Sequence, residues 1–171
     1  PNHGSDATYM ETTAVRDGDE WVINGMKRWN SGLHHATHDI IFARTSGKRG
    51  SPKGITAFLV PTDAPGFRVE FFWWTFNMPT DHAEVSLNGV RVPDDAVFGP
   101  VDDGLALAQH FVHENRIRQA ASSLGAAQYC IDEAVKYANL RVTWGKRLSL
   151  NQGIQFPLVE LHTEAAMLRW L

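Results

Sequence analysis

Residues 1–100 carry apolar residues in short runs punctuated by glycine and proline, as expected for β-strands. The first two runs, Ala14–Arg16 and Glu20–Gly25, flank the turn Asp17-Gly18-Asp19. An Asp-Gly pair supplies the positive φ angles that a tight turn needs. The pattern therefore predicts a β-hairpin at this point.

Three further runs of strand length follow along the chain. Asp39–Arg44 and Ile55–Val60 are separated by a flexible loop, Gly47–Pro52. The third run, Val85–Pro93, alternates apolar and polar residues until it ends at a proline. Regularly spaced short strands of this kind predict a small antiparallel β-barrel or sandwich.

After Pro100 the apolar residues recur at spacings of three and four, which predicts amphipathic helices. The first series comprises Ile117, Ala120, Leu124, Ala127, Ile131, Ala134 and Ala138. The second series comprises Ile154, Leu158, Leu161, Ala165 and Leu168. Residues 140–150, which include Gly145, predict a loop that joins two antiparallel helices. Pro157 would kink a helix that began near Asn151, so we expect the regular part of the second helix to begin near Pro157.

These patterns predict an α+β chain, with a β-domain over residues 1–100 and a helical segment over residues 101–171. Two helices alone cannot close a bundle, so we expect further helices, partner subunits or both to cover their apolar sides. The chain lacks an initiator methionine, and Leu171 lies inside an apolar helical pattern without a stop signal. The sequence therefore reads as a fragment of a multidomain protein.

The composition is that of a soluble globular protein, with 43% hydrophobic residues. The formal net charge of -3 comes from 16 basic and 19 acidic residues that are mixed along the sequence, which argues against a nucleic-acid partner. Cys130 is the only cysteine, so an internal disulfide is excluded and a reducing compartment is favoured. Its place among the helical apolar residues predicts a buried, inert thiol. Neither a membrane-spanning apolar run nor a signal-peptide pattern occurs, so we expect no stable membrane insertion.

The stretch Lys27–Gly32 is the first candidate for an active centre, because it places Trp29 two residues before Ser31. Residues two apart in an extended strand point to the same side, so the indole and the hydroxyl would face one planar guest. From these six residues alone, the favoured alternative is a core tryptophan followed by an ordinary turn. The rest of the chain decides between the two.

Several pieces of the sequence occur together in one order. They are Gly4-Ser5-Asp6, Trp29-Asn30-Ser31, Val90–Pro93, Arg116 ahead of Gly125, and Arg141 ahead of Trp144-Gly145-Lys146 and Gln152. In this order and spacing they resemble the FAD-dependent acyl-CoA dehydrogenase family over essentially the whole chain. The resemblance implies α,β-dehydrogenation of an acyl-CoA thioester, with electrons passed from FAD to an electron-transferring flavoprotein. It also implies the first two helices of a C-terminal four-helix bundle, in a homodimer or homotetramer.

The resemblance also implies which residues bind the cofactor. They are Gly4, Ser5, Trp29, Asn30, Ser31, Arg141, Thr143, Trp144, Asn151 and Gln152. In the family, the hydroxyl at the position of Ser31 donates near flavin N5, and the ring at the position of Trp29 packs against the flavin. The helical positions reach the FAD of a neighbouring subunit, where the guanidinium fork of Arg141 suits a pyrophosphate. Without the resemblance, Arg141 would be interpreted as a charge that complements the end of a helix.

The substrate-contacting positions of the family match Ser5, His113 and Arg116. Catalysis requires a carboxylate that removes the α-proton of the thioester. One of the two family positions for this base is held here by Asn115, whose amide cannot take a proton. Glu114 is adjacent but turned by roughly 100° on a helix. We therefore expect the base to lie beyond Leu171 and this chain to hold no catalytic residue of its own.

Two alternatives to this function stay open. An oxidase of the same fold, such as an acyl-CoA oxidase or nitroalkane oxidase, would pass its electrons to oxygen. A non-catalytic oligomerisation module would keep the fold without FAD, although the joint presence of Trp29, Ser31, Arg141 and Gln152 argues against it. The sequence leaves the compartment open between the cytoplasm and, in a eukaryote, the mitochondrion or peroxisome.

Two other segments are conspicuous. His34, His35 and His38 suggest a metal site, but no carboxylate or cysteine completes the ligand set at a suitable spacing. We predict a solvated loop and no metal there. The aromatic run Phe71–Phe76 fits a face of the β-domain or a surface on which an absent domain docks, and we prefer both to an acyl-chain pocket.

Overall fold

The structure is a computed structural model that describes residues 1–75 and 78–171, without the side chains of residues 78–81. The chain divides into two compact units, Pro1–His110 and Phe111–Leu171. The first unit holds six strands in one sheet, and the second is a helical hairpin. The predicted α+β class is confirmed.

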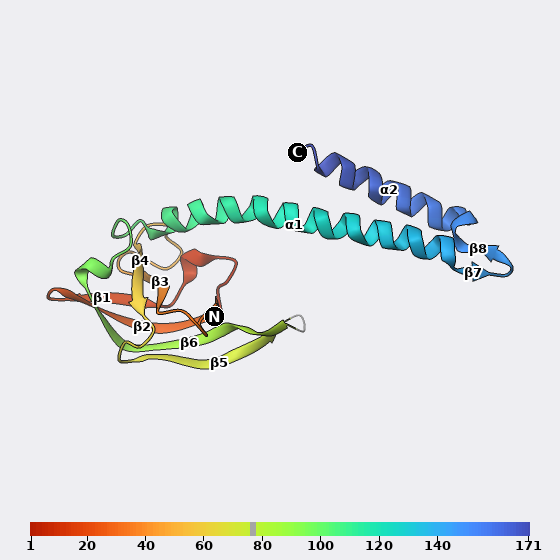
Figure 1. Cartoon of the computed structure of the whole chain (residues 1–171). Helices are drawn as coiled ribbons and strands as arrows, with labels where there is room; N and C mark the ends of the chain where they lie inside the picture. Colours follow the sequence, from red (N-terminus) through yellow and green to blue (C-terminus); the bar gives the residue numbers. More distant parts are fainter. Residues whose placement is uncertain (76–77) are drawn as a thin grey trace. The chain divides into compact units, whose positions relative to one another are not determined.

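The sheet is built from all six strands of the first unit (Figure 1). They are β1 (Thr13–Asp17), β2 (Glu20–Ser31), β3 (His38–Arg44), β4 (Ile55–Pro61), β5 (Phe67–Thr75) and β6 (Met78–Pro93). Their order is β4-β3-β1-β2-β6-β5, and every neighbouring pair is antiparallel except β1 and β3. The predicted strands are therefore present, and the parallel contact of β1 with β3 makes the sheet mixed.

The predicted hairpin joins β1 to β2, with its loop inside the predicted turn Asp17-Gly18-Asp19. Asp17 pairs with Glu20 across the ladder, which leaves Gly18 and Asp19 as the loop. Gly18 supplies the positive φ, at 65°. Arg91 of β6 donates to the carboxylates of Asp17 and Glu20 at 2.7 and 2.9 Å, so the hairpin end is also held from the neighbouring strand.

The core lies on one face of the sheet. Its largest fully buried apolar side chains are Phe58, Ile23, Ile41, Leu87, Val60, Val85 and Val90. The ring of Trp21 meets that of Phe58 edge-on, with their centroids 5.5 Å apart. Trp21 and Ile23 of β2 and Val90 and Val92 of β6 alternate with less buried residues, as in a sheet buried on one face. In β4, by contrast, all four residues of Ile55–Phe58 are buried, so this strand is covered on both faces.

Arg44, at the end of β3, is a buried cation that holds irregular backbone in place. The residue is only 8% exposed, and four backbone carbonyl oxygens surround its guanidinium. The guanidinium donates to the carbonyls of Thr8, Ser46, Ser51 and Lys53 at 2.6 to 3.2 Å. It thus ties both the N-terminal segment and the β3–β4 loop to the sheet.

The second unit continues the long helix α1 (Gly104–Leu140), whose first turns belong to the first unit. The connection to helix α2 (Gln152–Leu168) contains β7 (Val142–Thr143), β8 (Lys146–Arg147) and a short 3-10 turn (Leu148–Leu150). Helix α2 runs back beside α1 (Figure 1), as the sequence predicted. Within the described residues, no helix combines the length and the apolar character needed to cross a membrane.

Two predictions about the helices are wrong. Cys130 is exposed, because it lies one residue, roughly 100° of rotation, from Ile131, which is the residue that packs inward. Helix α2 begins at Gln152 and carries Pro157 inside it. The side chain of Asn151 caps the helix by accepting from the backbone N–H of Gly153 at 2.9 Å, which stabilises the first turn ahead of the proline.

Candidate functional site

Trp29 is the extra residue of a β-bulge in β2. Arg28 pairs with Glu84 and Asn30 pairs with Ala83, so Trp29 has no partner of its own on β6. Its φ is 77°, a left-handed conformation that is costly for a bulky residue. The indole is 52% exposed, with its ring centroid 5.4 Å from that of Trp73. The unfavourable backbone conformation of Trp29 therefore places its indole at the surface of the sheet.

Ser31 lies on the same face of the sheet as this indole. Its Oγ is 2.6 Å from Nδ1 of His82, its cross-strand partner on β6. His82 also pairs with Trp73 of β5, and paired residues share a face of a sheet. The indole and the hydroxyl thus share a face as the sequence suggested, although the bulge interrupts the simple alternation from which that prediction was made.

Arg28 joins this face because of the bulge. Its guanidinium donates to Glu84 at 2.7 Å and lies 5.1 Å from the ring centroid of Trp73 and 5.9 Å from that of Trp29. The indole N–H of Trp73 donates to the same oxygen of Glu84 at 3.2 Å. These contacts fix the arginine and both indoles as one layer beside Ser31.

Asn30 faces the opposite side, in the gap where β2 extends past β1. Its amide donates to Oδ2 of Asp39 at 2.5 Å and so links β2 to β3. Burial raises the pKa of Asp39, and the hydrogen bond from Asn30 opposes that rise. Burial also lowers the pKa of Lys27 to about 8, against the attraction of Asp39. A lysine and a carboxylate thus share the gap, each shifted toward its neutral form.

We expect Lys27 to make the stability of the protein depend on pH. Its pKa is lower in the folded state than the ordinary 10.5, so the unfolded state binds more protons between the two values. The free energy of unfolding should therefore rise from about pH 8 to about pH 10, by on the order of 1–2 kcal/mol. Urea unfolding at both pH values would measure this. Lys27→Met should remove the rise, whereas Lys48→Met, at an exposed lysine, should keep it; equal behaviour of the two variants would contradict the assignment.

A cavity of about 710 Å³ opens beside this region, within the first unit. Its walls include the segment from Pro1 to Gly4, the β2 residues Gly25–Trp29, and Leu105 and Ala108 of α1. Gly4 and Trp29, both predicted to bind the cofactor, therefore border one space. Ser5 is exposed next to it. A Cβ at Gly4 would meet no atom within 4 Å, so the space beside this glycine is open.

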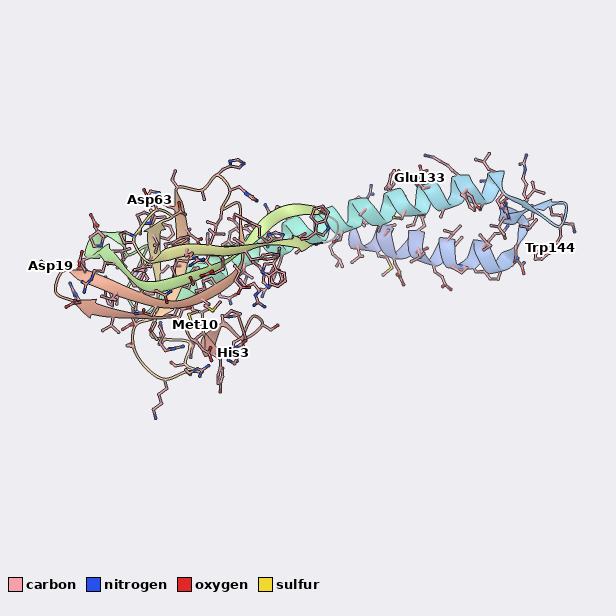
Figure 2. The ribbon with its side chains drawn as sticks, turned by 90° about the horizontal axis from the view of Figure 1, so that it is seen from below. His3, Met10, Asp19, Asp63, Glu133 and Trp144 are labelled. Carbon is pink, nitrogen blue, oxygen red and sulfur yellow. The ribbon has the colours of Figure 1, made fainter. Side chains whose placement is uncertain are left out.

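The remaining predicted cofactor residues gather at the turn of the helical hairpin. Trp144 and Gly145 form the two-residue loop between β7 and β8, with φ of 49° and 76°. Trp144 is 98% exposed at the far end of this unit (Figure 2). Among the described residues, no side chain hydrogen-bonds or pairs with the guanidinium of Arg141. The turn therefore presents a second strained, exposed indole and a cation available to an anionic group.

Thr143 and Gln152 lie at the same turn, in β7 and at the first position of α2, and Asn151 between β8 and α2 caps that helix. The predicted substrate residues His113 and Arg116 lie exposed on α1, in the second unit. Asn115, between them, accepts from Arg118 at 2.6 Å through its side-chain oxygen. The predicted site residues thus form two sets, one on the sheet and one on the hairpin.

Comparison with known proteins identifies the family. Residues 1–90 match the family model for the middle domain of acyl-CoA dehydrogenases, and residues 102–171 match the model for their C-terminal domain. The chain belongs to the acyl-CoA dehydrogenase family. This confirms the family predicted from the sequence motifs.

Three relatives illustrate the likeness. Acyl-CoA dehydrogenase FadE12 of Mycobacterium tuberculosis is 32% identical over 167 residues, which are 98% of this chain and 43% of that protein. The structure of a glutaryl-coenzyme A dehydrogenase glutaryl-CoA complex superposes with a TM-score of 0.87 at 30% identity, covering 99% of this chain and 43% of that one. The prolyl acyl carrier protein oxidase AnaB gives a TM-score of 0.87 at 26% identity, covering 97% and 44%. The chain thus spans less than half the length of each.

Sequence reasoning missed His82, Arg28 and Glu84, which surround the Trp29–Ser31 pair in this member of the acyl-CoA dehydrogenase family. Ser31 and His82 are 51 positions apart, so only the β2–β6 register brings them together. The alternation of His82 with Glu84 along β6 was the available sign that both share a face. Among the described residues, no group of three potential metal ligands occurs, and His34 stacks on Phe72 with centroids 3.8 Å apart.

Proposed function

We propose that this chain serves an FAD-dependent acyl-CoA dehydrogenase, which removes the α-proton and the β-hydride of an acyl-CoA thioester and passes the electrons to an electron-transferring flavoprotein. Membership of the family supports the reaction class, and the names of its relatives support the thioester substrate. FAD, when bound, supplies the acceptor for the hydride.

The observation that carries the proposal is the conformation of Trp29. A non-glycine residue at a φ of 77° is strained, and such strain concentrates where the side chain has a task. Here it exposes a flat indole on the same face as the hydroxyl of Ser31, beside an open cavity. A planar ring with a hydrogen-bonding edge fits this donor set, with Trp29 against the ring and Ser31 at its edge. Gly4 and Ser5 complete the sheet side of the proposed flavin site, whereas the side chain of Asn30, which the sequence had assigned to the cofactor, faces the opposite side and bonds Asp39.

The hairpin turn supplies the other side of the proposed site, in a neighbouring subunit. The guanidinium of Arg141 suits a pyrophosphate, and the indole of Trp144 offers a flat apolar surface. Thr143, Asn151 and Gln152 add polar groups around them. In this proposal, cofactor binding requires a homodimer or homotetramer. We also propose that the boundary between the β-domain and the helical domain of each subunit lies near Pro100.

The substrate end of the proposed site uses Ser5, His113 and Arg116 near the acyl thioester. Asn115 cannot act as the base, because an amide does not accept a proton at neutral pH. The catalytic carboxylate is then supplied from a part of the protein beyond Leu171. Within this chain, the side chains hold and orient the reactants.

Trp29→Gly tests the proposal. In the full-length protein, we expect flavin affinity to fall about tenfold or more. The variant loses a stacked aromatic contact of about 1 kcal/mol or more, and it also loses the indole that holds the neighbouring side chains in place. The free energy of unfolding should change by less than about 1 kcal/mol, because relief of the positive φ offsets the lost contact with Trp73. Titration of the apoprotein with FAD and urea unfolding measure the two effects.

Trp74→Gly is the matched control, because Trp74 is an exposed indole of β5 without a positive φ. It should bind flavin normally and lose about 1 kcal/mol of stability. Unchanged flavin affinity in Trp29→Gly would refute the assignment of Trp29. A full-length protein that takes up no FAD would refute the proposed function in favour of a non-catalytic module.

The alternative within the same fold is a flavin oxidase, and the likeness to AnaB is the observation in its favour. The two activities differ in their electron acceptor. Anaerobic reduction of the protein by acyl-CoA followed by admission of air would separate them: rapid reoxidation by oxygen indicates an oxidase, and persistence of the reduced flavin until an electron-transferring flavoprotein is added indicates the dehydrogenase.

A further inference from the structure

The hydroxyl of Ser31 has one partner among the described residues, Nδ1 of His82 at 2.6 Å. The two residues are directly paired across β2 and β6, so the sheet register sets this contact. The Oε2 atom of Glu84, the nearest acidic position on that face of β6, is engaged by Arg28 and Trp73. In the described part of the chain, no carboxylate contacts the imidazole, and the Ser31 contact is compatible with either tautomer of the ring.

A serine hydroxyl has a single hydrogen, and this limits what Ser31 can offer to a guest. When Nδ1 of His82 carries a proton, it donates to Oγ, and the hydroxyl hydrogen is free to be donated outward. When Nδ1 is a lone pair, the hydroxyl donates inward to the ring, and Oγ can only accept from a guest. The tautomer of His82 therefore decides whether Ser31 acts as a donor or as an acceptor.

Flavin N5 requires both roles in turn, because it accepts a hydrogen bond when oxidised and carries an N–H when reduced. Resting on the function proposed above, we infer that His82 is a positioning residue whose tautomer follows the redox state of the flavin. It is Nδ1-protonated opposite the oxidised ring and Nε2-protonated opposite the reduced ring. Ser31 then makes a well-formed hydrogen bond to N5 in both states.

The proton and electron balance closes without a further reactant. FAD, when bound, would accept at N5 the hydride that leaves the β-carbon of the thioester, and the catalytic base would take the α-proton. Water takes the proton from Nδ1 and delivers another to Nε2, so the number of protons on the protein side chain is unchanged. His82 is half-buried, which leaves its ring within reach of solvent for this exchange.

The test is an infrared difference spectrum, oxidised minus reduced, of the flavin-loaded full-length protein with and without ring-¹⁵N histidine. We expect isotope-sensitive histidine bands that report a change of tautomer. They should vanish in His82→Asn, whose side chain cannot change tautomer. They should also vanish in Ser31→Ala, which removes the hydroxyl that connects His82 to the flavin. His38→Asn is the control, because Nδ1 of His38 lies 3.1 Å from Oγ1 of Thr37 in a comparable pair elsewhere. It should keep the bands.

The rate at which substrate reduces the flavin should also fall about five- to tenfold in His82→Asn. A change of this size corresponds to the loss of one correctly oriented hydrogen bond. Flavin-loaded protein without redox-sensitive histidine bands, or with bands that survive in both His82→Asn and Ser31→Ala, would overturn the inference and leave the proposed function standing. A protein that binds no flavin at all would overturn both.

Discussion

Replacing Arg44 with methionine is expected to lower the free energy of unfolding by about 3–5 kcal/mol, the largest stability effect in the sheet unit. Methionine fills a similar volume, but the carbonyls of Ser46, Ser51 and Lys53 lose their bond to the guanidinium, and the carbonyl of Thr8 keeps only the backbone N–H of Gly50. The N-terminal segment and the β3–β4 loop would lose their common attachment. Denaturant unfolding followed by tryptophan fluorescence measures the change.

Arg49→Met is the matched control. Arg49 donates to Glu11 at 2.6 Å, but both side chains are about half exposed, so solvent screens the pair and its loss should destabilise the protein far less. Equal losses in the two variants would show that the buried hydrogen bonds of Arg44 are not what stabilises these segments.

Under the proposed function, replacing Arg141 with glutamine is expected to weaken FAD binding by the full-length protein about 100-fold. A bidentate, charge-assisted contact to a pyrophosphate contributes about 3 kcal/mol, and glutamine retains neither the charge nor the fork. Arg141→Lys keeps the charge alone and should bind with intermediate affinity. Calorimetric titration of the apoprotein with FAD gives the dissociation constants.

The matched control is Arg147→Gln, an exposed arginine on β8 of the same turn. It should change FAD affinity by less than about threefold, as expected for general screening of a surface charge. If Arg147→Gln weakens binding as much as Arg141→Gln does, the effect is one of overall charge and the specific pyrophosphate contact is refuted.

The elements of this chain could be predicted wherever the pattern is local. Five of the six strands and both helices follow from short apolar runs, from spacings of three and four, and from turn residues, all of which act over a few positions. Strand β5 was not among the predicted strands, because its aromatic run was interpreted only as a surface. The parallel contact of Thr13 with Arg44 could not be predicted, because it depends on the packing of distant strands. The start of α2 was placed too late, because the cap at Asn151 outweighs the cost of Pro157.

The candidate site was predictable in its residue types and less so in its contacts. Trp29 and Ser31 could be selected by spacing and family resemblance. His82 and Arg28 could not, because only the β2–β6 register and the bulge at Trp29 bring them to the same face. The helical apolar pattern showed which residues need a partner without showing what covers them: Ile131, Ala138 and Ala165 are buried, while Ile117 is 75% exposed. Burial of such residues depends on chains that a single sequence does not contain.

The two tryptophans held at positive φ, Trp29 and Trp144, have a consequence for the evolution of this chain. Glycine would adopt both conformations without strain, so mutation toward glycine at these positions carries little folding penalty. In a duplicated gene whose protein no longer binds the ligand, substitutions at these two positions would be among the first to accumulate. A sequence of this lineage with glycine at both positions would therefore be expected to come from a protein in which these two side chains no longer contact a ligand.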